Sequence, residues 1–247
     1  MMNDIFEVCA GSVSDCIQAE LGGANRVELN SALSLGGLTP SLATLQQVKA
    51  KTSLPVICMV RPRPAGFCYD KVEKETMFLD AKLLLENGAD GLAFGFLHKD
   101  TSIDVDTTKQ MVDLIHSYQK EAVFHRAFDC VNDPFMAIER LISCAVDRLL
   151  TSGLQAKAID GSALIAKLQK CYGDRIQLLA GSGINASNIL ELKELTKVHQ
   201  FHSSCRVWKK DLTTSVGNVS YAFHAKDDYD IVGLENVKRI VLKLRGK

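Results

Sequence analysis

Eight short runs of apolar and β-branched residues recur along the chain and alternate with stretches of helical pattern. The runs lie at residues 5–9, 26–30, 55–60, 91–96, 122–126, 147–153, 176–183 and 199–205, and the helical stretches include residues 13–21, 71–87, 106–119, 134–143 and 185–195. Strands that alternate with helices are typical of a parallel sheet. Eight such units in 247 residues predict an α/β fold, a (β/α)8 TIM-type barrel, with residues 1–247 as a single domain.

Three junctions between a helical stretch and the next apolar run resemble one another. GGANRVEL, NGADGLAF and CAVDRLLT each end a helix, turn on small residues or Asp, and enter a strand. Repeated junctions of this kind are what a closed barrel requires. An open doubly wound sheet would usually show G-x-G-x-x-G after its first strand, and none follows Cys9. We therefore favour the barrel and expect no nucleotide cofactor.

The last predicted strand is followed by a long connection, residues 206–230, before the final helix. Loops of this length are uncommon unless they are functional or partly structured. We therefore expect this segment to cover the mouth of the barrel.

The charges of the chain balance, with 29 Lys and Arg residues against 29 Asp and Glu residues. No positive excess is available to hold nucleic acid phosphates or an anionic membrane, and no apolar run approaches the roughly 20 residues of a membrane span. Residues 1–6 lack both the basic start and the apolar stretch of a secretory signal. We expect a cytoplasmic protein whose partner is a metal ion or a small molecule. A homodimer, the commonest oligomer, is the expected assembly if copies associate.

Side chains alternate along a strand, and those that face the helices of a barrel must be apolar. This rule predicts that the following side chains point into the barrel: Glu7, Cys9, Glu28, Asn30, Met59, Arg61, His125, Gln200, His202 and Ser204. Burying charged groups without partners is costly. The charged and imidazole groups of this set must therefore meet one another, water, an ion or a ligand. Most stand near the C-terminal ends of their strands, where barrel enzymes place their sites.

The inward residues have the chemistry of acid and base catalysis. Glu7, Glu28 and His125 are candidate acid and base groups, because different surroundings can separate the pKa values of neighbouring carboxyls. Arg126 is expected at the rim, and Asp129 in the next loop, where it orients a neighbour or caps a helix. The candidate catalytic residues are Glu7, Glu28, Arg61, His125, Arg126 and Asp129. The Glu and His groups could instead hold a divalent metal ion, and a purely structural ion network is a third alternative.

Arginine side chains and a glycine-rich turn provide candidate sites for an anion. Arg61 and Arg63 follow the third strand and could hold a carboxylate or a phosphate through paired hydrogen bonds. Residues 180–185, AGSGIN, precede a helix, where backbone N–H groups can bind phosphate. The alternative is a tight turn that needs glycine only for its dihedral angles. The candidate anion-binding residues are Arg63, Gly181, Ser182, Gly183, His202 and Ser203.

Eight cysteines are scattered along the chain without a C-x-x-C pair. We expect free thiols, most of them buried as small apolar side chains. Four could approach the C-terminal face of the barrel: Cys9, Cys68, Cys130 and Cys205. Thiolates suit copper(I), and two are enough for a near-linear site. Cys9, which alternation turns into the barrel, is the candidate metal ligand.

Seven blocks of the sequence occur in the order found in the CutC family, whose members are named as copper homeostasis proteins. The blocks are FEVCAGSV, GGANRVELNSALSLGGLTPS, RPRPAGFCY, FHRAFD, RLLTSG, GSGI and FHSS. The chain resembles this family from residue 6 to about residue 204. The resemblance implies a TIM-type barrel in the cytoplasm that binds copper(I) through thiols, including the cysteine at the Cys9 position. A second family cysteine, which commonly follows VEL, is replaced here by Asn30.

Two functions stay open on the sequence. The resemblance favours a copper homeostasis protein that binds copper(I). The inward Glu, Arg and His set favours a barrel enzyme of isomerase or lyase type, which acts on a sugar, a sugar phosphate or a hydroxy acid. A barrel that binds a ligand without catalysis would have the same sequence features, because a fold does not determine a function.

Overall fold

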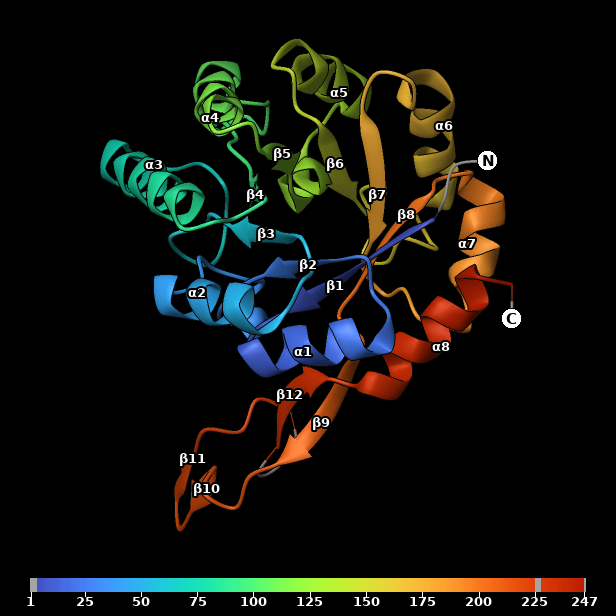
Figure 1. The fold of residues 1–247 in the computed structure, drawn as a ribbon. Helices are drawn as coiled ribbons and strands as arrows, with labels where there is room; N and C mark the ends of the chain where they lie inside the picture. Colours follow the sequence, from blue (N-terminus) through green and yellow to red (C-terminus); the bar gives the residue numbers. More distant parts are fainter. Residues whose placement is uncertain (1–3, 225–227, 247) are drawn as a thin grey trace.

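The computed structural model describes residues 4–224 and 228–246. Eight parallel strands follow one another round a closed barrel, and β8 pairs with β1 to close it (Figure 1). The strands are β1 (Ile5–Ala10), β2 (Arg26–Leu29), β3 (Val56–Met59), β4 (Gly91–Phe94), β5 (Glu121–Phe124), β6 (Arg148–Thr151), β7 (Gln177–Gly181) and β8 (Gln200–Ser203). The predicted TIM-type barrel is confirmed.

Helices lie outside the barrel and connect its strands (Figure 1). They are α1 (Val13–Gly22), α2 (Leu42–Lys51), α3 (Lys71–Glu86), α4 (Val105–Ser117), α5 (Pro134–Ser143), α6 (Ser162–Tyr172), α7 (Ile189–Thr196) and α8 (Leu234–Leu244), with short 3-10 helices η1 (Leu33–Leu35) and η2 (Arg126–Cys130). Ser12 caps α1, and Asp70 with Glu73 forms a capping box at α3, so that first-turn N–H groups find acceptors. In the part of the chain that the structure describes, no helix combines the length and hydrophobicity of a membrane span.

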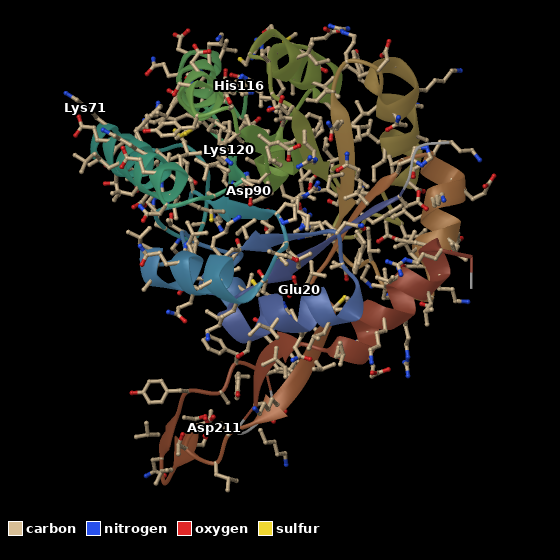
Figure 2. All side chains as sticks on the ribbon, viewed as in Figure 1. Glu20, Lys71, Asp90, His116, Lys120 and Asp211 are labelled. Carbon is tan, nitrogen blue, oxygen red and sulfur yellow. The ribbon has the colours of Figure 1, made fainter. Side chains whose placement is uncertain are left out.

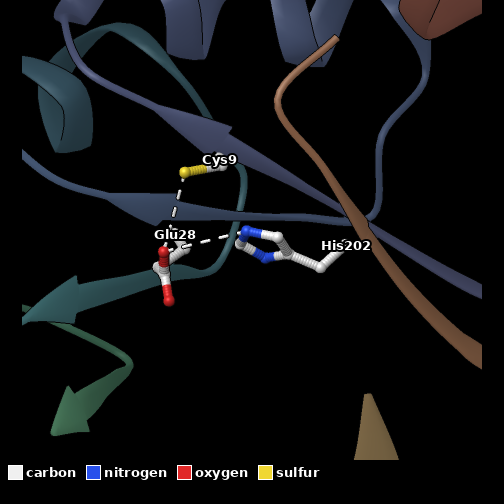
Figure 3. A group of neighbouring side chains, drawn as sticks. All are labelled: Cys9, Glu28 and His202. Atoms are coloured by element: carbon white, nitrogen blue, oxygen red, sulfur yellow. Dashed lines mark hydrogen bonds and ion pairs between the residues drawn. The ribbon is translucent and has the colours of Figure 1, made fainter. Parts of the chain in front are cut away.

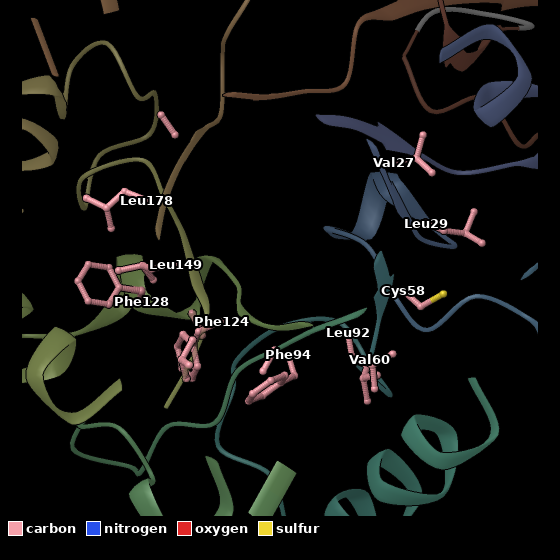
Figure 4. Close-up of a cluster of buried hydrophobic side chains, with 14 of the residues drawn as sticks. Val27, Leu29, Cys58, Val60, Leu92, Phe94, Phe124, Phe128, Leu149 and Leu178 are labelled. Atoms are coloured by element: carbon pink, nitrogen blue, oxygen red, sulfur yellow. The ribbon is translucent and has the colours of Figure 1, made fainter. Parts of the chain in front are cut away.

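Side-chain alternation sorts the strand residues as predicted. The apolar residues assigned to the outer face belong to one buried cluster, part of which Figure 4 shows: Phe6, Val8, Val27, Leu29, Val56, Cys58, Val60, Ala122, Phe124 and Phe201. Each large apolar side chain that is fully buried contributes roughly 1.5–3 kcal/mol to stability. A second and much smaller apolar cluster, Ile57, Met59, Ala93 and Val123, lies on the opposite face of β3, β4 and β5. Polar side chains occupy much of the remaining barrel interior.

The three similar helix-to-strand junctions share one hydrogen bond. Asn25, Asp90 and Asp147 stand immediately before β2, β4 and β6. Each side chain accepts a hydrogen bond, at 2.7–2.9 Å, from a backbone N–H near the start of the preceding strand. Lys49 contacts Asp90 at 2.7 Å. Lys120 contacts the same carboxylate at 3.5 Å (Figure 2). These acceptors satisfy N–H groups at the strand ends and so hold three pairs of neighbouring strands in register.

The described part of the segment after β8, residues 206–224 and 228–230, extends away from the barrel, so the expectation that it covers the barrel mouth is wrong. Arg206, at the base of the segment, still lines the cavity at the mouth. An antiparallel pair, β9 (Arg206–Lys210) and β12 (Asp228–Val232), carries a short hairpin of β10 (Ser215–Val216) and β11 (Val219–Ser220). The segment extends outward past α1 (Figure 1). We refer to residues 206–224 and 228–232 as the arm. Backbone pairing between its strands directs the arm away from the barrel.

Candidate functional site

A cavity of about 200 Å³ lies at the C-terminal ends of the barrel strands, where barrels place their functional sites. The predicted site residues that line it are Cys9, Glu28, Arg61, His125, Arg126 and His202, and other lining residues include Asn30, Phe67 and Arg206. The predicted residues belong to β1, β2 and β8 or follow β3 and β5. We refer to this space as the mouth cavity. The barrel thus gathers six predicted residues from distant parts of the sequence.

Cys9, Glu28 and His202 converge in one part of the mouth cavity (Figure 3). The Sγ of Cys9 lies 3.7 Å from Oε2 of Glu28, and Nε2 of His202 lies 4.0 Å from the same oxygen. A ligand atom of each side chain lies within 4.8 Å of the other two. β1 pairs with both β2 and β8, which brings the three strands together. Among the described residues this Cys–Glu–His cluster is the one group of three potential metal ligands.

Glu7 lies deeper in the barrel and holds His202 in place. Its Oε1 is 2.7 Å from Nδ1 of His202, and its Oε2 forms an ion pair with Arg26. Because Glu7 engages Nδ1, Nε2 is the nitrogen that faces Glu28. Burial raises the pKa of Glu7, but Arg26 and His202 outweigh burial and leave this pKa well below its ordinary value. Glu7 is therefore ionised and supports the mouth cavity from below without lining it.

The surroundings of the Cys–Glu–His cluster set its protonation. Burial raises the pKa of Cys9 and of Glu28, against the influence of His202. Burial lowers the pKa of His202, but Glu28, Cys9 and Glu7 raise it well above its ordinary value. His202 is therefore an imidazolium beside carboxyl groups, and Cys9 is a thiol. A metal ion that bound these groups would replace their protons.

Asn30 fixes the carboxyl group of Glu28. Its Nδ2 donates to Oε2 of Glu28 at 2.9 Å and lies 3.6 Å from Sγ of Cys9. Its Oδ1 is buried without a hydrogen-bond partner in the described part of the chain. The backbone of Gly37 approaches this oxygen so closely that a Cβ there would lie 2.4 Å from it. Asn30 therefore adds an amide beside the cluster, where the resemblance implies a second thiol.

Arg61 and His125 both pack against the ring of Phe67 in another part of the lining. The Cζ of Arg61 is 5.1 Å from the centre of this ring, and the ring centres of Phe67 and His125 are also 5.1 Å apart. The guanidinium of Arg61 donates to three backbone carbonyls in the loops after β2 and β3, at 2.7–3.3 Å. Arg61 therefore ties these two loops together at the edge of the mouth cavity.

His125 is neutral, and its Nδ1 acts as an acceptor. The N–H of Ala127 donates to Nδ1 at 3.2 Å, so the proton of the neutral ring lies on Nε2. Burial and the nearby charge of Arg61 lower the pKa of His125 to about 3. The ring lies against the backbone of Gly95, where a Cβ would be 2.5 Å from Cε1. An imidazole in this state is a hydrogen-bond donor at Nε2.

Asp129 orients Arg126 and the loop after β6. Its carboxylate accepts hydrogen bonds from the hydroxyl of Thr151 and from the hydroxyl and N–H of Ser152, at 2.6–3.0 Å. It also pairs with Nε of Arg126 at 2.7 Å. Asp129 therefore orients a neighbour, which is one of its two predicted roles. It does not cap the next helix, because Asp133 caps α5.

Several predicted residues lie outside the mouth cavity. Arg63 is partly exposed and pairs with Glu73. Cys68 and Cys130 are exposed, whereas Cys205 is buried and lines a different cavity. The four thiols therefore do not form one site, because Cys68, Cys130 and Cys205 follow three different strands and lie outside the mouth cavity.

The glycine-rich turn after β7 is also separate from the mouth cavity. Gly183 and Ser203 line a neighbouring cavity of about 460 Å³. Ser182 donates its hydroxyl to the carbonyl of Ala156 at 2.7 Å, and Gly181 is the last residue of β7. The backbone at Ser182 and Gly183 is left-handed, with φ of 83° and 70°. This turn conformation accounts for Gly183, because glycine adopts it without strain.

Two buried arginines of the barrel interior are not among the site residues predicted from the sequence. Arg26 and Arg148 are the first residues of β2 and β6. Arg26 pairs with Glu7, and Arg148 pairs with Glu121 at 2.9 Å. The sequence does contain a signal for Arg26. It precedes Glu28 by two residues on the same strand, so the alternation that points Glu28 into the barrel points Arg26 inward as well.

The fold and the mouth cavity together define a class, a TIM-barrel protein with a candidate metal-binding cluster at the C-terminal ends of its strands. The model of the CutC family matches residues 4–207. The chain belongs to the CutC family.

Relatives with known names extend over most of the chain. A family protein CutC from Treponema denticola is 44% identical over 248 residues, which cover 99% of this chain and 100% of that protein. A human protein named copper homeostasis protein cutC homolog is 41% identical over 202 residues, 82% of this chain and 73% of that protein.

Solved structures share the fold. A CutC protein from Streptococcus agalactiae has a TM-score of 0.76 and 28% sequence identity, and the match covers 81% of this chain and 98% of that one. A phosphoribosylanthranilate isomerase from Thermotoga maritima has a TM-score of 0.59 at 12% identity, with 100% of both chains covered. The second likeness shows the barrel fold alone.

We expect Glu7→Gln to lower the free energy of unfolding by about 3–5 kcal/mol, because it leaves Arg26 buried without its carboxylate partner. Urea denaturation of the purified variant measures the change. The control is Glu75→Gln, which removes an exposed partner of Lys71 and should cost less than about 1 kcal/mol. Equal effects of the two changes would contradict a central role for Glu7.

We expect Gly95→Ala to displace the ring of His125 and to lower the free energy of unfolding by about 1–3 kcal/mol, because a new Cβ would overlap Cε1 and Nδ1. Histidine-selective NMR and urea denaturation measure the two effects. Gly66→Ala is the matched control, since a Cβ at Gly66 meets no atom within 4 Å. An unchanged His125 signal in Gly95→Ala would refute the close approach.

Proposed function

We propose that this chain binds a copper(I) ion at the Cys–Glu–His cluster as part of a copper homeostasis function. Cys9 and His202 are the main ligands in this proposal, and Glu28 is a third donor beside them. The observation that carries the proposal is the convergence of the three side chains from β1, β2 and β8 on one point of the mouth cavity. The name of the human relative agrees with this role.

The donor atoms fit a copper ion in chemistry and in spacing. A thiolate is a soft ligand that suits copper(I), and an imidazole also binds copper. With bonds of the length that zinc makes, about 2.3 Å to sulfur and about 2.0 Å to nitrogen, one ion bridges atoms roughly 4.3 Å apart. The ligand atoms of the cluster lie within 4.8 Å of one another, so small side-chain movements suffice.

The contacts behind His202 support the same proposal. Metal-binding imidazoles usually donate their second N–H to a carboxylate, which fixes the ring and its tautomer. Glu7 provides this partner at 2.7 Å from Nδ1 and is itself paired with Arg26. The arrangement leaves Nε2 of His202 directed toward Glu28.

The composition of the cluster also suits a divalent ion. One cysteine, one histidine and one carboxylate with a free fourth position resemble the ligand sets of catalytic zinc sites. Metal-assisted chemistry on a sugar, a sugar phosphate or a hydroxy acid is therefore the second candidate function. The mouth cavity next to the cluster favours it, because it leaves space for a ligand.

A cytoplasmic location fits the proposal. The eight cysteines are free thiols, as expected in a reducing compartment. Such a compartment also keeps copper in its singly charged state. The homodimer stays a prediction.

An anaerobic competition titration with a copper(I) chelator tests the proposal. We expect one tightly bound ion per chain in the wild type and a loss of affinity on the order of 100-fold or more in Cys9→Ser. Glu7→Gln should weaken binding by about 10–100-fold, because it removes the partner that orients His202. Cys171→Ser, which changes an exposed thiol on α6, should bind as the wild type does.

Two outcomes would overturn the copper(I) proposal. One is equal affinity in Cys9→Ser and the wild type, which would remove its central ligand. The other is tight binding of zinc with weak binding of copper(I), which would favour the second candidate function.

A further inference from the structure

We propose that the mouth cavity binds the carboxylate group of a small organic acid, which accepts hydrogen bonds from the Nε–H of Arg61 and the Nε2–H of His125. This inference concerns a different part of the lining from the Cys–Glu–His cluster and does not depend on the copper proposal.

The first observation is a pair of buried donors without partners. Arg61 and His125 are 6% and 3% exposed, and both line the mouth cavity. Within residues 4–224 and 228–246, neither Nε of Arg61 nor Nε2 of His125 has a hydrogen-bond partner. Buried polar groups are nearly always hydrogen-bonded in folded proteins. Both residues line the mouth cavity, as does Asn30, whose Oδ1 also lacks a partner in the described part of the chain. We therefore infer that the acceptor for the two donors comes from outside the chain.

The second observation is the uncompensated charge of Arg61. Its guanidinium donates to three backbone carbonyls. By contrast, the other two arginines of the mouth cavity have carboxylate partners: Arg126 pairs with Asp129 at 2.7 Å, and Arg206 pairs with Asp230 at 3.3 Å. Arg61 is thus a buried cation whose described contacts include no carboxylate. A bound anion would supply the missing charge.

The protonation of His125 narrows the chemistry of the ligand. Nδ1 already accepts the N–H of Ala127, so Nε2 presents a hydrogen and can only donate. Arginine also offers only donors. The two free groups therefore require a ligand that accepts hydrogen bonds at two atoms. A carboxylate has this property and carries the negative charge that Arg61 lacks.

Size and shape favour a small acid over a phosphate ester. The mouth cavity measures about 200 Å³, below the roughly 300–1,000 Å³ of sites for drug-sized ligands. The ring of Phe67 packs against both Arg61 and His125 and fills part of the space beside them. Two free donors match the two oxygens of a carboxylate, whereas a phosphate ester brings three acceptor oxygens into the same space.

Calorimetric titration of metal-free protein, prepared with EDTA, tests the proposal. The probes are acetate, glycolate and malonate, with glycolamide as the uncharged analogue of glycolate and inorganic phosphate as the competing anion. We expect at least one of the three acids to bind saturably, and glycolamide to bind about tenfold or more weakly than glycolate, because it lacks the charge. Inorganic phosphate should bind more weakly than the best acid.

Variants of His125 separate binding from folding. In His125→Asn the side-chain oxygen can still accept the N–H of Ala127, but the donor at Nε2 is lost, so affinity for the acid should fall about tenfold or more. In His125→Gln the amide nitrogen reaches the position of Nε2 and should restore much of the binding. His98→Asn changes an exposed imidazole outside the cavity and should bind as the wild type does. Histidine-selective NMR should show the Nε2 signal of His125 move when the acid is added.

Each contrary result overturns the assignment. Saturable binding of none of the three acids would refute a carboxylate site. Equal affinity in His125→Asn and the wild type would place the acid elsewhere. Tighter binding of inorganic phosphate than of every acid would assign the site to a phosphate. Arg61→Met should also lose binding of the acid. If that variant fails to fold, the His125 variants still test whether the carboxylate binds at this site.

Discussion

The carboxylate of Glu7 is the charge inside the barrel on which the rest of the site depends. β1 lies between β2 and β8, and Glu7 contacts Arg26 on one neighbour and His202 on the other. The pairing of β1 with β8 closes the barrel, so the bond between Glu7 and His202 crosses the closing seam. A buried carboxylate needs both partners to stay ionised. The strand pairing that closes the barrel therefore also places His202 against Glu7.

Much of this arrangement follows from the sequence because a strand has only two faces. Once Phe6 and Val8 are assigned to the face of the strand that contacts the helices, Glu7 and Cys9 must point into the barrel. The same rule points Glu28 and His202 into the barrel. The three similar junctions have a physical basis as well, since each supplies a side-chain acceptor to a neighbouring strand. The order of the strands then brings the inward residues together without any loop being predicted.

The contacts that the sequence does not predict lie mostly in the loops, where strand alternation does not apply. Asp129 finds its partners at Thr151 and Ser152, more than twenty residues away, and only the folded chain brings these loops together. Arg63 stands two residues beyond Arg61, yet the chain has left the strand there and its side chain pairs with Glu73. The arm differs from its prediction because its two strands find each other across a long connection. Loop geometry depends on such distant partners, which local patterns do not encode.

The arm leaves and rejoins the barrel at neighbouring points. The N–H of Gly233 donates to the carbonyl of Cys205 at 2.9 Å, and β9 pairs with β12 from Arg206 and Val232 onward. The CutC family model ends at residue 207, at the base of the arm. A connection whose ends already touch can change length at little entropic cost. The arm can therefore be lengthened, shortened or exchanged in evolution as a unit. A peptide grafted between β10 and β11 would likewise leave the register of the eight barrel strands unchanged.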